Sequence, residues 1–355
     1  MPRAKGHEMK SASTSTPNSA QDPAKEQAEA LSVYVSSSPH VHSAEDVSWI
    51  MRQVIYALIP GALVGVYFFG LPALKVIAIA MVSCVALEAI WQKLTNSPLT
   101  IKDGSAALTG LLLAMNLPSG APWWLVVIGS LVAIIVAKQL FGGIGNNPFN
   151  PALVGRVFLL ISFPVAMTTW PEPRSFFTQA ADATTGATPL GALKTAIFEH
   201  GSIAAAPGMS LMDPFLGNVG GSLGEISALA LLLGGVYLIA RRIITWHIPV
   251  VYIGTVVVLT GIFWLINPEG YASPAFHLVA GGLMLGAFFM ATDMVTSPIS
   301  NTGKIVFAVG CGVITVVIRL WGGYPEGVSF AILIMNAFVP LINRATKPAK
   351  FGAVR

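Results

Sequence analysis

"QLFGGIGNNPFNPALVGRVF", residues 139–158, aligns without a gap on "RLWGGYPEGVSFAILIMNAF", residues 319–338. A second pair, "LVGVYFFG" (63–70) and "LGGVYLIA" (233–240), repeats the correspondence earlier in each half. Both pairs lie in strongly apolar sequence, where chance similarity is the alternative explanation. A duplication of this kind predicts a membrane protein built from two related halves.

The composition supports a membrane protein. Of the 355 residues, 54% are hydrophobic and only 10% are charged, with a mean hydropathy of +0.71. Soluble domains carry about 25% charged residues. A basic face with interleaved aromatic residues is missing, so no nucleic-acid partner is predicted. The two cysteines, Cys84 and Cys311, are too few for a zinc or iron–sulfur site, which needs about four ligands, so we predict no metal site.

Ten apolar segments are candidates for transmembrane helices, because a spanning helix needs about 20 mostly apolar residues. The third is short and ends at Pro118, which predicts a broken or tilted helix. The expected spans are 53–69, 72–94, 104–117, 122–141, 150–168, 227–243, 248–266, 275–292, 304–320 and 327–343.

Basic residues predict the orientation, because Lys and Arg near span ends favour the cytoplasmic side. With the N-terminus inside, only Lys75, Arg174, Lys194 and Arg319 of the 20 basic residues fall outside. Five spans per half is an odd number, so the second half must be inverted. The expected fold is therefore an all-α polytopic membrane protein of two inverted five-helix repeats with one long outer loop.

The predicted organisation follows from these spans. In a bacterial inner membrane both termini would lie in the cytoplasm and the long loop in the periplasm. The parts are a disordered cytoplasmic tail (1–46), the first repeat (47–168), the periplasmic loop (169–226), the second repeat (227–343) and a cytoplasmic tail (344–355).

The outer loop contains a small, hydroxyl-rich stretch, "ADATTGATPL" (181–190). A threonine hydroxyl is a poor nucleophile and has to enter another enzyme's active site to be activated. Small neighbours such as Gly186 and Ala187 would let such an enzyme approach the backbone closely. The loop is expected to be exposed and to present a threonine for modification. The alternative is an unmodified turn rich in Ser and Thr.

Asp182, Thr185, Gly186, Ala187 and Thr188 resemble the flavinylation motif of the RnfD/NqrB family, in which a flavin transferase attaches FMN to the final threonine through a phosphodiester bond. The segments "SPHVHS", "VYFFG", "FGGIGNNPFNPALVGRVFLLISFP" and "FMATDMVTSPISNTGK" also resemble this family. The similarity covers about residues 37 to 343. It is nearer to the D subunit of the Rnf complex than to the longer NqrB, although Ala183 replaces a usual glycine and Met294 a frequent proline.

The resemblance implies covalent FMN on Thr188, which makes the chain a phosphoprotein in the chemical sense. It also implies a second, non-covalent flavin, for which riboflavin is a candidate. The partners would be the other Rnf subunits, namely membrane subunits, an FMN-bearing G subunit and iron–sulfur subunits, together with the transferase and membrane lipid. Electron transfer between ferredoxin and NAD would be coupled to Na⁺ or H⁺ translocation.

Two alternatives to this function stay open. An inverted-repeat solute channel or transporter without a redox cofactor would have the same architecture, because fold does not fix function. The other alternative is the B subunit of the sister Na⁺-translocating NADH:quinone reductase. The flavin motif is the feature that separates a redox subunit from a transporter.

Three acidic residues are candidates for an ion or proton path. Glu88 and Asp293 lie inside or beside predicted spans, where charge is costly and often functional. Asp103 lies at the edge of a span. A structural role is the alternative for each; for Glu88 it would involve Lys93 or Gln92, one turn away.

Four further residues are candidate contacts of a second flavin. Asn146, Asn147 and Asn150 lie in the loop "GGIGNNPFNP" (142–151), and their amides could bond to the edge of an isoalloxazine ring. Capping of the following helix is the alternative for the asparagines. Arg156 would either neutralise a flavin phosphate or semiquinone or extend to the inner headgroups.

Overall fold

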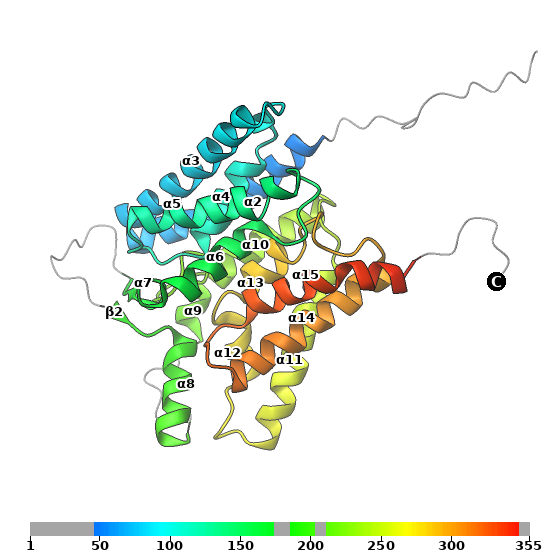
Figure 1. Ribbon diagram of the computed structural model, residues 1–355. Coiled ribbons are helices and arrows are strands. Elements are labelled where there is room, and N and C mark those ends of the chain that lie inside the picture. The colour runs from blue at the N-terminus through cyan, green and yellow to red at the C-terminus, as the bar shows by residue number, and fades with distance from the viewer. Residues whose placement is uncertain (1–45, 174–184, 203–210, 348–355) are drawn as a thin grey trace, which may run out of the picture. The chain divides into compact units, whose positions relative to one another are not determined.

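The computed structural model describes residues 46–173, 185–202 and 211–347, and these belong to one compact unit. Asp182 of the motif, nearly all of the predicted N-terminal tail and the end of the C-terminal tail lie outside the described residues. The described chain is helical apart from one short antiparallel ribbon (Figure 1).

The first half begins with two long helices, α2 (Val47–Phe69) and α3 (Leu71–Leu94). The Asp46 carboxylate accepts from the Trp49 amide at 2.7 Å and so starts α2 six residues before the predicted span. Gly70, with φ of 64°, separates the two helices. The remaining elements of this half are η1 (Ile101–Asp103), α4 (Ser105–Met115), α5 (Trp123–Leu131), the π-helix η2 (Val132–Val136), η3 (Gln139–Phe141), α6 (Pro151–Ser162) and α7 (Pro164–Thr168).

The predicted outer loop has a structure of its own. Strand β1 (Trp170–Pro171) pairs with β2 (Thr185–Gly186), and helices α8 (Pro189–His200) and α9 (Met212–Leu216) follow. The second half then consists of α10 (Ala228–Ala240), α11 (His247–Ile266), α12 (Pro274–Val279), α13 (Leu283–Leu285), the π-helix η5 (Gly286–Met290), α14 (Asn301–Trp321) and α15 (Val328–Ala345).

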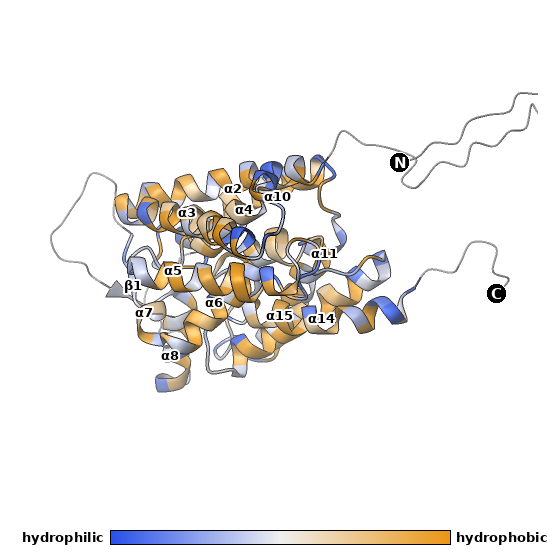
Figure 2. Ribbon diagram, turned by 45° about the horizontal axis from the view of Figure 1, so that its top comes forward, coloured by the Kyte–Doolittle hydropathy of each residue, from blue (hydrophilic) through white to orange (hydrophobic). Residues whose placement is uncertain are grey.

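Six helical segments of the described chain are long and apolar enough to cross a membrane: α2, α3, the run Trp123–Phe141, α11, α14 and α15. Three further apolar helices, α4, α6 and α10, are shorter and stand where the third, fifth and sixth spans were predicted. Many apolar side chains on the long helices are exposed, for example Leu63, Val82 and Val258. The ribbons of the long helices are largely orange, that is hydrophobic, in Figure 2. Such exposed surfaces suit contact with lipid.

Two predicted spans are interrupted. The span at 150–168 divides at Phe163, because Pro164 disfavours helical geometry in the residue before it, and α7 begins there. The span at 275–292 breaks between α12 and α13, where Ala280 is extended and Gly281 has φ of 75°. The crossing of all ten segments and the inverted repeat therefore stay predictions.

The two halves contact one another through their short helices. Helix α10 packs on α2, and α6 contacts α15 (Figure 1). The α2–α10 contact is close, since a Cβ atom at Gly234 would collide with the carbonyl oxygen of Ala57. Small residues allow such backbone approach between membrane helices. The end of α4 is tied to the segment before α10, where the Gly224 amide donates to the Met115 carbonyl at 2.6 Å.

Candidate functional site

Thr188 begins helix α8. Its hydroxyl accepts a hydrogen bond from the Gly191 amide at 3.0 Å, and Pro189 occupies the first helical position. Only 5% of Thr188 is exposed, whereas its neighbours Thr185 and Ala187 are exposed. The expectation of a fully exposed acceptor is therefore wrong for Thr188 in this conformation, because the hydroxyl caps a helix whose start rests against the membrane helices.

Helix α8 is fixed in two ways. Leu190 and Leu193 pack against Phe276 and Ala280 of the α12 region in a small apolar cluster. The ammonium of Lys194 donates to backbone carbonyls at the end of α14 and after it, at 3.1 Å for Ile318 and 2.8 Å for Tyr324, and also to the Gly322 carbonyl. A cation there also opposes the partial negative charge at the C-terminus of α14.

A small cavity lies beside Thr188 and is bordered by Glu225, Gly281 and Glu326. Its volume of about 10 Å³ holds at most one water molecule. The carboxylates on its wall belong to a buried ion cluster centred on Arg156.

Arg156 projects from α6 into this cluster. Its Nη1 donates to Asn116 Oδ1 at 2.6 Å, and its Nη2 donates to Glu225 Oε1 at 3.2 Å and to Glu326 Oε2 at 2.8 Å. All three charged side chains are largely buried, with exposures of 8%, 5% and 13% for Arg156, Glu225 and Glu326. The interpretation that Arg156 extends to the inner headgroups is therefore wrong, because its guanidinium is held by two acids inside the protein.

The two acids of the cluster differ in their affinity for a proton. Burial, followed by the charge of Glu326, raises the pKa of Glu225 to about 8 in spite of Arg156. Burial also acts to raise the pKa of Glu326, but Arg156 and hydrogen bonds from Glu225 and the Gly282 amide hold it below its ordinary value. Glu225 is thus the acid of the pair with the higher affinity for a proton.

Glu225 and Glu326 were missed as site residues from the sequence. Glu225 was one acid among several in the predicted outer loop, and Glu326 belongs to the turn "GGYPEG" (322–327). Their partner Arg156 is 69 and 170 residues away in sequence, respectively. The available signal was Arg156 itself, since a cation in an apolar span requires buried acceptors.

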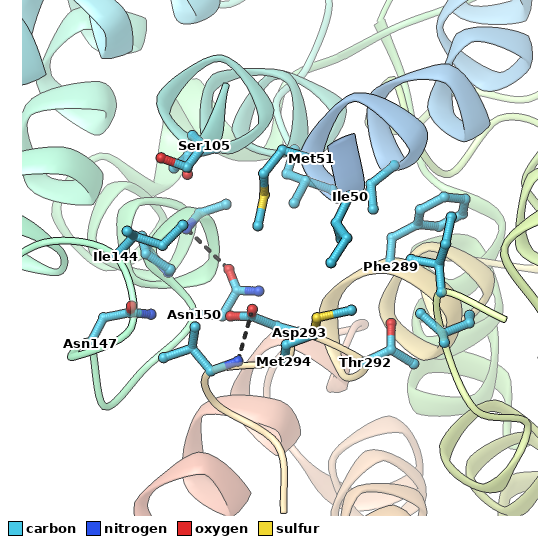
Figure 3. A pocket seen from close by; sticks show the side chains of 18 of the residues that line it. Ile50, Met51, Ser105, Ile144, Asn147, Asn150, Phe289, Thr292, Asp293 and Met294 are labelled. Atoms are coloured by element: carbon cyan, nitrogen blue, oxygen red, sulfur yellow. Dashed lines mark hydrogen bonds between the residues drawn. The ribbon is translucent and has the colours of Figure 1, made fainter. Parts of the chain in front are cut away.

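A second polar site lies around the start of α6 (Figure 3). Asn147, Asn150 and Asp293 border a pocket whose opposite side is formed by Ile50 and Met51 of α2. Other lining side chains are Ser105, Thr109, Lys138, Phe288 and Phe289. The structure therefore brings three of the predicted residues together, although they come from different halves of the chain.

The asparagines of this pocket have local structural roles as well. Asn150 accepts from the Ala152 and Leu153 amides at 3.1 and 3.3 Å, and its Nδ2 donates to the Met290 carbonyl at 3.3 Å. Asn147 donates to the Phe149 carbonyl at 3.1 Å. Asn146 is exposed and does not border the pocket. Arg156 is six residues along α6 from Asn150, or about 9 Å, and belongs to the other site.

The acidic candidates are placed in three different settings. The Asp293 carboxylate accepts from the Val295 amide at 3.3 Å and from the Thr296 hydroxyl at 3.1 Å. Asp103 accepts from the amide and the hydroxyl of Ser105 at 2.8 and 2.7 Å, which starts α4. The structure thus ties Asp103 to the first residue of α4 and leaves Asp293 on a pocket wall.

Glu88 is fully buried in an ion pair. Lys138 Nζ lies 2.9 Å from Glu88 Oε1 and also donates to Ser105 Oγ at 2.7 Å. Gln139 donates to the same carboxylate at 2.6 Å, and Gln92 does so at 3.4 Å. The basic partner of Glu88 is therefore Lys138 and not Lys93. This ion pair forms because α3 packs against the end of the α5 segment.

These features define a class of protein: a helical membrane protein with ion pairs buried in its interior and with a short helix, α8, packed against its second half after the threonine motif. The chain belongs to the NQR2, RnfD, RnfE family, whose sequence model matches residues 34–352.

Similar proteins cover nearly the whole chain. It is 50% identical over 322 residues to the D subunit of the proton-translocating ferredoxin:NAD(+) oxidoreductase complex of Clostridium ljungdahlii, covering 90% of this chain and 96% of that protein. It is 49% identical over 327 residues to the D subunit of the Na(+)-translocating ferredoxin:NAD(+) oxidoreductase complex of Acetobacterium woodii, covering 92% and 97%. The D subunit of the ion-translocating oxidoreductase complex of Escherichia fergusonii is 41% identical over 347 residues, covering 90% and 98%.

Proposed function

We propose that this chain is the D subunit of a membrane-bound, ion-translocating ferredoxin:NAD⁺ oxidoreductase complex and that it carries FMN covalently on Thr188. The observation that carries the proposal is the match to the D subunits of such complexes over at least 96% of their length, together with the threonine motif at the start of α8. The other subunits of such a complex are then its partners. The names of these relatives favour this complex over the sister quinone reductase.

The position of Thr188 suits a phosphodiester. A helix N-terminus has free amide donors and partial positive charge, both of which stabilise phosphate. Helix α8 offers this N-terminus directly at the Thr188 hydroxyl, and Gly186 and Ala187 leave little side chain in front of it. Bound FMN would supply one-electron transfer chemistry. The cavity beside Thr188 is too small for a flavin ring, so the ring would lie on the side of exposed Thr185 and Ala187.

The buried hydroxyl also indicates when the modification takes place. A transferase needs access to the Thr188 oxygen, which in the docked state bonds to the Gly191 amide. We infer that FMN is attached while the start of α8 is undocked from α12 and α14. This agrees with attachment before the subunits assemble.

A second, non-covalent flavin such as riboflavin would be bound at the pocket of Figure 3. The volume of this pocket, about 90 Å³, is below the roughly 300–1,000 Å³ of pockets for organic ligands, so its walls would have to separate. Asn147 and Asn150 offer amide groups for a ring edge, while Met51, Phe288 and Phe289 offer apolar and aromatic surface. Pockets for flat organic ligands combine such apolar walls with a few polar groups. Asp293 on the same wall stays our candidate for the ion path, with Glu88 in its ion pair as a second candidate.

Helix contacts support the proposed inverted repeat. Numbering the ten predicted segments in order, the first packs on the sixth and the fifth contacts the tenth. The second contacts the third and the fourth, and correspondingly the seventh contacts the eighth and the ninth. Both third-position segments, α4 and the broken α12–α13, are incomplete helices. We propose ten crossings of the inner membrane, with the termini in the cytoplasm and the Thr188 loop in the periplasm.

The test is whether the chain fluoresces on a denaturing gel under ultraviolet light when made with an active flavin transferase. Thr188→Val should abolish the band, and Thr169→Val, at an exposed threonine outside the motif, should retain it. Incomplete helices at corresponding places in two halves also occur in transporters, which keeps a solute transporter as the second candidate. A dark wild-type band would favour that transporter, and a fluorescent Thr188→Val band would move the attachment site to another hydroxyl such as that of Thr185.

A further inference from the structure

The buried cluster at Arg156 contains one more acid than its hydrogen-bonding base can neutralise. A single guanidinium nitrogen, Nη2, donates to both Glu225 Oε1 and Glu326 Oε2. Because they share this donor, the two carboxyl groups lie close together. A direct hydrogen bond between them would require a proton on one of them, because a carboxylate oxygen only accepts.

The charges lead to the same conclusion. With both acids ionised, the triad of Arg156, Glu225 and Glu326 would carry a net charge of about −1. Arg319 is the nearest further cation, but it donates to carbonyls and would offset this charge only through space. Ionising two neighbouring acids in one buried site is unfavourable, so the pair retains one proton. With that proton the triad is neutral. The Gly282 amide donates to Glu326 Oε1 at 2.6 Å, which favours Glu326 as the ionised member and Glu225 as the proton carrier.

The other charged and titratable groups near the pair leave this proton in place. Arg319 directs its Nη1 and Nη2 to the carbonyls of His277 and Ala280 at 2.7 and 3.1 Å, and its buried Nε has no partner. Neither ring nitrogen of buried His277 is hydrogen-bonded. The Tyr252 hydroxyl bonds to Thr315. Arg319 is thus the second positive charge beside Glu326, held by carbonyls rather than by a carboxylate.

The buried Ser222 hydroxyl is available to form a hydrogen bond at the site. It faces Glu225, with no exposure to solvent and no hydrogen bond of standard geometry. The adjoining cavity of about 10 Å³ is bordered by Thr188, Glu225 and Glu326. The cavity has no room for a hydrated metal cation. In addition, the positively charged guanidinium of Arg156 already binds both carboxyl groups. The ligand that fits is a proton.

We propose that Glu225 and Glu326 form a proton-binding site that holds one exchangeable proton between two carboxyl groups, beside Thr188 and at the junction of the two halves. Loss of the proton leaves two carboxylates around Arg156 and passes H⁺ to water at the adjoining cavity. Because Arg156 belongs to the first half and Glu326 to the second, each proton changes the charge at the junction by one unit. This site is independent of whether Thr188 carries FMN.

The experiment is an infrared titration of the purified complex. A protonated carboxylic acid absorbs at a C=O stretching frequency where carboxylates do not, and the band shifts in D₂O. We expect a band in the wild type that disappears with a midpoint at about pH 8. Glu225→Gln should remove it, and Glu269→Gln, an exposed matched acid, should retain it.

Each outcome decides the proposal. A band that survives Glu225→Gln assigns the proton to another group and overturns it. A midpoint that moves with Na⁺ concentration shows a metal cation competing for the carboxyl pair and also overturns it. The wild-type titration needs no variant, so absence of any titrating acid band is a third refutation. A band whose midpoint is independent of Na⁺ and that depends on Glu225 supports the site, whether or not the sample is flavinylated.

Discussion

Replacing Arg156 by Met should destabilise the protein strongly. The change removes hydrogen bonds to Asn116, Glu225 and Glu326 and leaves two buried acids without their cation. Breaking a buried ion pair by removing one partner costs about 3–5 kcal/mol. At about 2 °C per kcal/mol for a large domain, the midpoint of thermal unfolding should fall by roughly 6–10 °C.

The loss should also depend on pH. Without Arg156 the folded-state pKa of both acids rises above the unfolded value, so their contribution to stability is present at low pH and lost as pH rises through the folded pKa. The deficit of Arg156→Met relative to wild type should therefore be larger at pH 8 than at pH 5. Thermal unfolding of the solubilised complex, followed by size-exclusion fluorescence at both pH values, measures it.

Arg344→Met is the matched control, because Arg344 is an exposed arginine in the last turn of α15. It should change the midpoint by less than about 1 °C, since exposed charges contribute little. The triple variant in which Glu225→Gln and Glu326→Gln accompany Arg156→Met should recover part of the loss. Equal midpoints for Arg156→Met and Arg344→Met would refute the cluster as described.

Three further predictions concern other parts of the molecule. Lys194→Met removes the hydrogen bonds that tie α8 to the end of α14, so amide hydrogen exchange across 185–200 should accelerate about tenfold. The control Lys75→Met, at an exposed lysine, should leave the exchange unchanged. Equal exchange in both variants would contradict this role of Lys194. Gly234→Ala places a methyl group against the Ala57 carbonyl and should lower the free energy of unfolding by about 1–3 kcal/mol. Gly254→Ala, which has open space around it, should not lower it. Equal stability of the two variants would argue against the α2–α10 contact. Asp293→Asn should slow ion-coupled turnover severalfold with flavin loading intact, and unchanged ion pumping would remove Asp293 from the ion path.

Local chemistry explains which parts of the fold were predictable from the sequence. Apolar length predicted the long helices, and Pro118 with its neighbours predicted the short α4. The breaks at Phe163 and Ala280 were missed because a continuous apolar pattern hides them. Pro164 and Gly281 are the local causes, and each is compatible with a helix in other contexts.

The site depended more on distant contacts. The threonine motif identified Thr188, but its burial follows from the docking of α8 on α12, which no local pattern encodes. The structural alternative for Glu88 named Lys93 or Gln92. Gln92 does donate to Glu88, but the ion pair is with Lys138, 50 residues further along the chain. The same reason applies to Arg156, whose partners follow from the meeting of the two halves. Sequence patterns thus identified candidate residues, whereas their partners are determined by tertiary packing.

The central claim, that Thr188 carries FMN, is tested most directly by mass spectrometry of the chain purified from its native membrane. We predict an intact mass above that of the sequence by one FMN less one water, and a peptide map that places the addition on Thr188. A chain at its unmodified mass, or an addition on another residue such as Thr185, would contradict the account.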